Sequence, residues 1–235
     1  MIPAYNEEKR LSATLDAVVA HLAEMRYSFA ELIVVDDGST DLTARVVEEY
    51  RETHACLRLL RNPGNRGKGY SVRYGMLEAK GEWILCSDAD LSSPIEELAK
   101  LLDAARKEDA AVAIGSRALD RSLVVVHQSR FREMSGRFFN LVMRALTGLP
   151  FRDTQCGFKL YRADAAKAVF SRQILDGFSF DVEDLCIARH LGFKTLEVPV
   201  RWSNVEGTKV SALAGLKSFT DLVKVRWYFM SGRYR

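Results

Sequence analysis

The 235-residue sequence lacks several features that would place it in a specialised class of protein. Its four cysteines form no C-x-x-C pair, and no histidine stands near them at zinc-ligand spacing. The net charge is only +3, which gives no general argument for binding nucleic acid. With 48% hydrophobic residues, the chain can bury a sizeable core, and its length is typical of one domain.

Long apolar runs are also missing. No uninterrupted stretch approaches the ~20 residues that a membrane-spanning helix needs, and the first eight residues are not a basic segment followed by an apolar one. We therefore expect a cytoplasmic chain that does not cross a membrane by itself. The G-x-x-x-x-G-K-[ST] pattern of a P-loop is absent as well.

Three short apolar runs predict strands that are buried on both faces of a parallel sheet. They span residues 32–35, 83–86 and 111–114, and each ends at a polar turn. Helical spacing of apolar residues lies between them, at 11–25 and 95–102. This alternation predicts a doubly wound, mostly parallel α/β sheet with helices on its faces. Further along, we expect helices at 131–146, 181–191 and 213–230, and a strand at 195–200.

Polar residues follow each predicted strand. Ligands of open α/β sheets bind outside the carboxyl ends of the strands. We therefore expect these side chains to converge: Asp36, Asp37, Asp88, Asp90 and Arg117.

Asp88-Ala89-Asp90 is the sharpest chemical signal in the chain. Two carboxylates at positions i and i+2, directly after a strand, can approach one hard divalent cation with oxygen ligands. The alternative is an ordinary acidic turn, because short D-x-D patterns are common.

Three other segments carry weaker signals. Carboxylates in 36–41 can accept hydrogen bonds from hydroxyl or N–H groups, or can simply form a turn and cap the next helix. Residues 2–8 leave a strand and enter a helix, with Tyr5 placed to face a planar ring and Asn6 or Glu7 at the cap. The glycine-rich stretch 64–69 puts Arg66 and Lys68 in a flexible loop that suits phosphate or is merely solvated.

Together these segments resemble family 2 glycosyltransferases of the GT-A fold, over nearly the whole chain. The matching elements are Pro3-Ala4-Tyr5-Asn6-Glu7, Asp36-Asp37-Gly38-Ser39-Thr40-Asp41, Gly67-Lys68-Gly69 and Asp88-Ala89-Asp90. The resemblance implies a nucleotide-sugar donor and Mg²⁺ or Mn²⁺ held by Asp88 and Asp90, with Asp90 the more direct ligand. The implied donor-binding residues are Pro3, Ala4, Tyr5, Glu7, Asp36, Asp37, Lys68, Asp88 and Ala89.

Later segments resemble the polyprenyl-phosphate sugar synthases within that family. They are Gly115-Ser116-Arg117, Asp153-Thr154-Gln155-Cys156-Gly157-Phe158-Lys159, Phe180-Asp181-Val182-Glu183, Val198-Pro199-Val200 and Gly207-Thr208-Lys209. Residues 153–159 and 225–228 look most like the dolichyl-phosphate β-glucosyltransferases, which implies UDP-glucose as donor and a polyprenyl phosphate as acceptor.

The sequence departs from the family pattern at two places. The family's first strand normally begins several residues before the motif that here starts at Pro3, so either the start is truncated or that edge of the sheet is shortened. Mannosyl-type relatives often carry Gln two residues after the second aspartate, where this chain has Ser92. The second departure counts against a mannosyl donor.

The resemblance implies an inverting displacement in which the acceptor phosphate attacks the anomeric carbon and UDP leaves. A phosphate is already anionic near pH 7, so no strong general base is required. Asp153 is expected to orient the sugar or the acceptor; the alternative is a turn carboxylate. The acceptor phosphate is expected to contact Arg117, Arg130, Arg132, Ser135 and Lys209, because arginine matches phosphate oxygens in paired geometry.

The last segment has the composition of an interfacial helix. Residues 201–235 contain seven Lys or Arg against two acidic residues, with Trp227, Tyr228, Phe229 and Tyr234 among them. We predict a catalytic domain at 1–210 and an amphipathic helix at 211–235 that lies on the cytoplasmic face of a membrane. The alternative is a helix that packs on the catalytic domain or on a partner subunit.

Two other functions compete with lipid glucosylation. One is a glycosyltransferase of the same fold that acts on a polysaccharide or another glycan. The other is a non-catalytic domain that binds a nucleotide-sugar, against which the retention of both Asp88 and Asp90 argues. The sequence leaves a homo-oligomer open.

Overall fold

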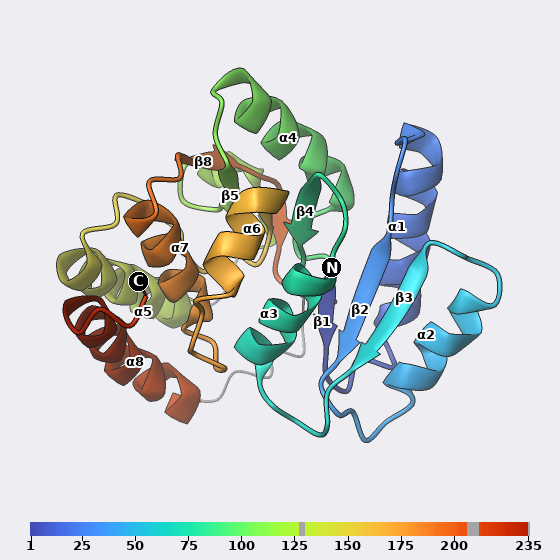
Figure 1. Ribbon diagram of the computed structural model, residues 1–235, viewed down its shortest axis with the longest axis horizontal. Coiled ribbons are helices and arrows are strands. Elements are labelled where there is room, and N and C mark those ends of the chain that lie inside the picture. Colours follow the sequence, from blue (N-terminus) through green and yellow to red (C-terminus); the bar gives the residue numbers. More distant parts are fainter. Residues whose placement is uncertain (127–129, 206–211, 235) are drawn as a thin grey trace.

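One twisted sheet, built from two hydrogen-bonded groups of strands, organises the molecule (Figure 1). The computed structural model describes residues 1–126, 130–205 and 212–234. The first group has the order β1-β2-β3 and the second β4-β7-β5-β8. The Met1 nitrogen donates to the Leu85 carbonyl (2.6 Å) and Ser87 N donates to the Met1 carbonyl (3.1 Å). These two bonds join the groups into the order β3-β2-β1-β4-β7-β5-β8.

Most strands of this sheet run parallel. Their bounds are β1 Ile2–Ala4, β2 Leu32–Asp36, β3 Leu57–Arg61, β4 Trp83–Cys86, β5 Val112–Ser116, β7 Lys159–Arg162 and β8 Thr195–Pro199. β7 is antiparallel to both of its neighbours, β4 and β5. A small parallel sheet pairs β6 (Val124–Val126) with β9 (Trp202–Ser203). The predicted mostly parallel α/β architecture is therefore confirmed, with one reversed strand in the middle of the sheet.

Helices cover both faces of the sheet. Their bounds are α1 Leu11–Met25, α2 Thr43–Arg51, α3 Lys68–Glu78, α4 Leu98–Lys107, α5 Arg130–Thr147, α6 Ala163–Phe170, α7 Phe180–His190 and α8 Ala212–Met230, with short 3₁₀ helices at Ile95–Glu97 and Arg121–Leu123. α1 has the predicted bounds, and the other predicted helices are present within a few residues of their expected ends. Among the described residues, no helix is long and apolar enough to span a membrane.

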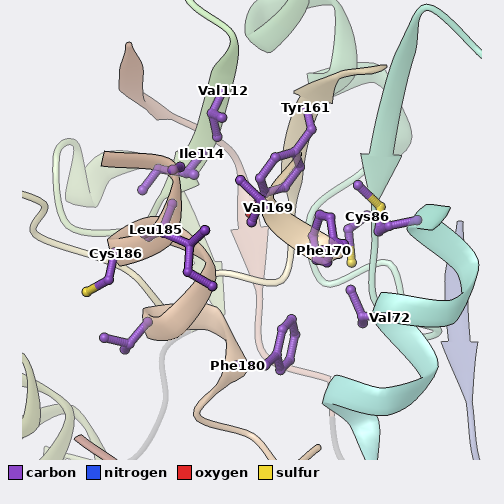
Figure 2. Close-up of a cluster of buried hydrophobic side chains, with 14 of the residues drawn as sticks. Val72, Cys86, Val112, Ile114, Tyr161, Val169, Phe170, Phe180, Leu185 and Cys186 are labelled. Atoms are coloured by element: carbon purple, nitrogen blue, oxygen red, sulfur yellow. The ribbon is translucent and has the colours of Figure 1, made fainter. Parts of the chain in front are cut away.

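The side chains of the sheet divide between the two faces because successive residues of a strand point in opposite directions. On one face, Val112 and Ile114 pack with α3, α6 and α7, and Figure 2 shows Val72, Phe170 and Phe180 converging there. On the other face, the alternate residues of β1 and β2 pack on α1, and those of β5 and β7 pack on α4. The carboxyl ends of the parallel strands are left at one edge of these layers.

α8 packs on the protein with one face and exposes another. Leu222 and Val225 are fully buried in the same core cluster as β5, against α5 and α7. Val223, Trp227 and Met230 lie on the opposite side and are 58%, 54% and 76% exposed. The packed helix and the exposed apolar stripe therefore occur together.

Asp184 is an exception to the rule that buried carboxylates have partners. Asp184 is 1% exposed, and neither of its carboxylate oxygens has a hydrogen-bond partner among the described residues. Burial, reinforced by the nearby charges of Glu183 and Asp181, raises the pKa of Asp184 well above its ordinary value. The native state therefore binds this proton more tightly than the unfolded chain does.

We expect Asp184→Asn to stabilise the protein more at pH 8 than at pH 5. A raised pKa contributes stability at low pH that is lost as pH rises, because the native state must keep the proton. The asparagine carries no such proton, so its advantage should grow with pH to about 1–3 kcal/mol. Denaturant unfolding at both pH values measures the difference. Equal differences between the variant and the wild type at both pH values would contradict the assignment.

Candidate active site

The predicted site residues of β1, β2, β4 and β5 lie at the carboxyl edge of the sheet. The first two of these strands interlock through their following turns. Asp37 N donates to the Ala4 carbonyl (2.8 Å), and Glu7 N donates to Thr43 Oγ1 (2.7 Å). Tyr5, predicted to face the base of the donor, is 37% exposed beside this frame.

Asp37 has a structural task at this edge. Its carboxylate accepts hydrogen bonds from Asn62 Nδ2 (2.7 Å), Arg66 N (2.8 Å) and Gly67 N (2.9 Å). Asp37 therefore holds the turn that leads into α3 and so positions Lys68. Asp36, also buried, accepts one bond from Ser39 N (3.1 Å).

The stretch 64–69 is only partly the flexible loop that was predicted. Gly67 caps α3, and Lys68 and Gly69 are its first residues. A Cβ on Gly67 would lie 2.4 Å from the Asp176 carbonyl oxygen, and one on Gly69 equally close to that of Leu175. These glycines are required because the start of α3 packs directly on the backbone of the segment before α7.

The acidic turn after β4 is tight. Leu91 N donates to the Asp88 carbonyl (3.2 Å), Ser92 N donates to Asp90 Oδ1 (2.9 Å), and Leu91 adopts a positive φ of 45°. Thr14 Oγ1 of α1 donates to the Ala89 carbonyl (2.7 Å) and fixes the middle of the turn. Asp88 and Asp90 are consequently held within one turn, as their spacing predicts.

Lys68 neutralises the first of these carboxylates. Its Nζ lies 2.6 Å from Asp88 Oδ1 and 5.9 Å from the centre of the Phe180 ring. Burial opposes the charge on both groups, but the pairing outweighs it: the pKa of Asp88 is lowered and that of Lys68 is raised. Both side chains therefore stay charged at neutral pH.

The residues of the turn fit a divalent cation. Asp88 and Asp90 offer hard carboxylate oxygens, and Mg²⁺ is usually held by one or two carboxylates together with substrate phosphates and water. The described residues hold no cluster of three or more His, Cys, Asp or Glu that could bind a metal without a substrate. This donor set therefore suits a cation that is shared with a bound diphosphate.

Arg117, which is partly buried, and Asp153, which is buried, form an ion pair through two hydrogen bonds. Arg117 Nε and Nη2 donate to the two carboxylate oxygens (2.6 and 2.7 Å), and Arg117 N adds a third bond (3.0 Å). Burial opposes ionisation of Asp153, yet the guanidinium holds the pKa of this carboxyl below its usual range. The guanidinium also lies 5.2 Å from the centre of the Trp202 ring.

This pair belongs to the same site as Asp88. A Cβ built on Gly157, four residues after Asp153, would lie only 2.1 Å from Asp88 Oδ2. The positive charges of Arg117 and Lys159 also act on Asp88 and lower its pKa. The turn 153–157 therefore closes over the acidic turn after β4.

The remaining predicted acceptor residues are only partly within the described structure. Ser135 lies exposed on α5, and Arg130 and Arg132 belong to the same helix, but their side chains are outside the described part of the structure. Lys209 lies outside the described residues altogether. Their contacts with an acceptor stay predictions.

Sequence reasoning missed three residues that hold the site together. Lys159, buried at the start of β7, donates to the Cys156 carbonyl and pairs with Asp181 of α7. Glu197 of β8 accepts hydrogen bonds from Ser116 Oγ (2.7 Å) and Asp153 N (2.8 Å). Lys159 and Asp181 do fall inside motifs that the sequence singled out, whereas Glu197 lies in an ordinary strand pattern.

The fold and the carboxylate edge define a nucleotide-sugar transferase of the GT-A type. The family model "Glycosyl transferase family 2" matches residues 1–170. The chain belongs to glycosyltransferase family 2 and is a glycosyltransferase.

Two proteins that resemble this chain over most of its length carry the same enzyme name. Dolichyl-phosphate β-glucosyltransferases of Trichomonas vaginalis and Homo sapiens are 36% and 34% identical to this chain. The alignments cover 97% and 100% of this chain and 72% and 76% of those proteins.

Solved structures support the fold at lower identity. Glucosyl-3-phosphoglycerate synthase from Mycobacterium tuberculosis, solved with Mn²⁺, UDP-glucose and phosphoglyceric acid, has a TM-score of 0.67 and 18% identity, over 96% of this chain and 78% of that one. Mannosyl-3-phosphoglycerate synthase from Rubrobacter xylanophilus has a TM-score of 0.68 and 17% identity, over 99% and 74%. The predicted GT-A fold is confirmed.

Gly157→Ala should weaken the site while the protein stays folded. The added methyl group would meet Asp88 Oδ2, so the turn or the carboxylate must move, at a cost of about 1–3 kcal/mol. We expect Mn²⁺-dependent binding of UDP-glucose, measured by calorimetry, to fall about tenfold or more. Gly177→Ala is the matched control, because no atom lies within 4 Å of its added Cβ. Equal affinity in the two variants would show that the close approach is unimportant.

Proposed function

We propose that this enzyme transfers glucose from UDP-glucose to a polyprenyl phosphate of the dolichyl type, with inversion at the anomeric carbon. The relatives that it matches over nearly its full length are named dolichyl-phosphate β-glucosyltransferases. The observation that carries the chemistry is the closure of the Asp153–Gly157 turn over Asp88. It brings a metal-type carboxylate pair and a buried arginine–aspartate pair into one site.

The residues divide the reaction between them. Asp88 and Asp90 would hold Mg²⁺ or Mn²⁺, which when bound neutralises the negative charge that develops on the departing diphosphate. Lys68 stands at the start of α3, with its ammonium 2.6 Å from Asp88, and contributes positive charge on the same side. Tyr5 and Glu7, which follow β1, and Asp36, the last residue of β2, are assigned to the nucleoside.

Arg117 and Asp153 are assigned to the acceptor side. Asp153 uses both oxygens on Arg117, so it is unsuited to act as a strong base, and a phosphate nucleophile does not need one. The ion pair occupies Nε and Nη2 of Arg117 and leaves Nη1 outside it. We assign Nη1 to a phosphate oxygen of the acceptor, which places the nucleophile by geometry and charge.

A lipid acceptor requires contact with a membrane, and α8 and α5 offer the surface for it. Val223, Trp227 and Met230 are exposed on α8, and Met134, Phe138 and Leu141 at 68%, 60% and 66% on α5, a set spaced along one side of each helix. Arg233 lies 5.2 Å from the Trp227 ring centre and adds positive charge beside it. We assign these stripes to peripheral contact with the cytoplasmic face of a membrane.

The first experiment is transfer from radiolabelled UDP-glucose to a short polyprenyl phosphate in the presence of Mg²⁺ or Mn²⁺. We expect organic-extractable label that a chelator abolishes and that Asp90→Ala reduces at least about 100-fold. Asp109→Ala, a substitution of a fully exposed aspartate outside the site, is the control and should leave the rate unchanged.

The other outcomes identify the competing functions. Transfer from a different nucleotide-sugar would retain the mechanism and correct the donor. Transfer to a glycan but not to lipid would favour the polysaccharide alternative. UDP-glucose binding without turnover on any acceptor would favour a nucleotide-sugar-binding domain.

The membrane assignment is tested separately. We expect the double variant Trp227→Glu, Met230→Glu to lose co-sedimentation with anionic phospholipid vesicles about tenfold, because it puts two charges on the apolar stripe. Met25→Glu is the matched control, since Met25 is 43% exposed on α1, which packs on the other face of the sheet. Unchanged sedimentation of the double variant, with transfer to a water-soluble short-chain acceptor intact, would refute this surface.

A further inference from the structure

We infer that Glu197 is a positioning residue that fixes the Arg117–Asp153 pair for the acceptor, an inference that rests on the proposed function. Glu197 lies in β8 opposite Ile114 of β5. It therefore points to the same face of the sheet as Ile114, which is fully buried in the main core cluster. A carboxylate on this apolar face needs hydrogen-bond donors, and the segments that supply these donors show which parts of the site Glu197 holds.

Within the described part of the chain, the donors to Glu197 come from the two segments that carry the ion pair. Ser116 Oγ, in the residue before Arg117, donates to Glu197 Oε1 (2.7 Å). Asp153 N donates to the same oxygen (2.8 Å), and Arg152 N donates to Oε2 (2.9 Å). One carboxylate thus binds the end of β5 and the start of the 152–157 turn at the same time.

Glu197 acts on the pair without touching the reacting groups. The hydrogen bonds from Arg152 N and Asp153 N to Glu197 fix the position of the Asp153 backbone. Ser116 Oγ also accepts a hydrogen bond from Ala118 N (3.3 Å), which bends the chain directly after Arg117. Glu197 therefore holds the segment of Arg117 through Ser116 Oγ and the segment of Asp153 through its backbone N–H, while the Arg117 and Asp153 side chains hold each other. Gly115 N also donates to the Phe158 carbonyl (2.8 Å) and joins the same two segments where β5 pairs with β7, so Glu197 and the ion pair hold the part of the turn that lies beyond this ladder.

This placement matters because misplacing a reacting group by about 1 Å can cost about 100-fold in rate. The donor half of the site has its own anchors, chiefly Asp37 under the turn before α3. A change at Glu197 should consequently lower kcat with the lipid acceptor and leave the affinity for UDP-glucose as it is. A residue that merely stabilised β8 would affect unfolding but not this division between kcat and donor affinity.

The experiment compares Glu197→Leu with Glu197→Gln. Leucine removes every acceptor, and we expect kcat to fall about 100-fold while the calorimetric Kd for UDP-glucose with Mn²⁺ stays within about twofold. Glutamine keeps an acceptor oxygen for Ser116 Oγ and Asp153 N, so it should restore kcat to within about fivefold of the wild type. If the leucine variant does not fold, Glu197→Asp replaces it, because a carboxylate shortened by one methylene cannot reach both segments.

Glu31→Leu is the matched control. Glu31 also accepts a hydrogen bond from the backbone N–H of a residue distant in the chain, Lys80, and it lies next to the start of β2 at the opposite edge of the sheet. We expect it to lower stability and leave kcat unchanged. The inference is overturned if Glu197→Leu keeps the wild-type kcat, or if it loses donor affinity as strongly as kcat.

A readout independent of turnover separates this inference from the proposed function. The Nε–H of Arg117, held by Asp153, should exchange slowly with solvent by NMR in the wild type and in Glu197→Gln, and rapidly in Glu197→Leu. If the wild-type enzyme transfers nothing to a lipid phosphate, the proposed function fails while this exchange still tests the anchoring. Slow exchange in Glu197→Leu would overturn the anchoring itself.

Discussion

The contact between Asp88 and its neighbours is the constraint on which the site depends. The Asp88 side chain is 33% exposed, so it loses only part of its hydration, and a carboxylate in this position is still stabilised by a paired charge. Lys68 supplies the pairing charge from the start of α3, and the bare backbone of Gly157 supplies the space on the other side. Three segments that are distant in the chain, those of Lys68, Asp88 and Gly157, must therefore meet at the Asp88 carboxylate before the site is formed.

The reversed strand β7 makes this meeting possible. Because it is antiparallel, its first residue, Lys159, pairs with Cys86, the last residue of β4. The turn that precedes β7 consequently lies at the carboxyl edge of the sheet, beside the acidic turn. A parallel strand in this position would have brought its last residues to the edge instead. The same geometry lets Lys159 form an ion pair with Asp181 at the start of α7, which joins β7 to α7 next to the site.

The sequence was sufficient for the parts of the site that depend on local order. The carboxylates of β2 and β4 follow apolar runs, so their place at the end of a strand follows from chain order alone. The tasks of individual residues required tertiary register. Asp37, predicted to bind the donor, also holds the backbone of Arg66 and Gly67, 29 and 30 residues away. Arg117, predicted to contact the acceptor phosphate, also pairs with Asp153.

Glu197 shows why the remainder could not be predicted. Its segment alternates as any half-buried strand does, and nothing local distinguishes a carboxylate that anchors a catalytic turn from one that faces water. Only the register that sets Ile114 opposite Glu197 reveals its surroundings. Stability-related and function-related carboxylates are thus alike in sequence and differ in which backbone N–H groups they reach.

α8 combines two features that the sequence presented as alternatives, a face that packs on the protein and an exposed apolar stripe. A helix of 19 residues has room for more than one apolar stripe, and here Leu222 and Val225 join the core while Trp227 stays exposed. The phenyl rings of Phe138 and Phe219, 6.1 Å apart, tie the helix to α5. A helix fixed in this way offers a rigid apolar surface, so binding to a lipid interface would not require ordering of the helix itself. The packing of α8 on the protein is therefore compatible with the proposed membrane contact.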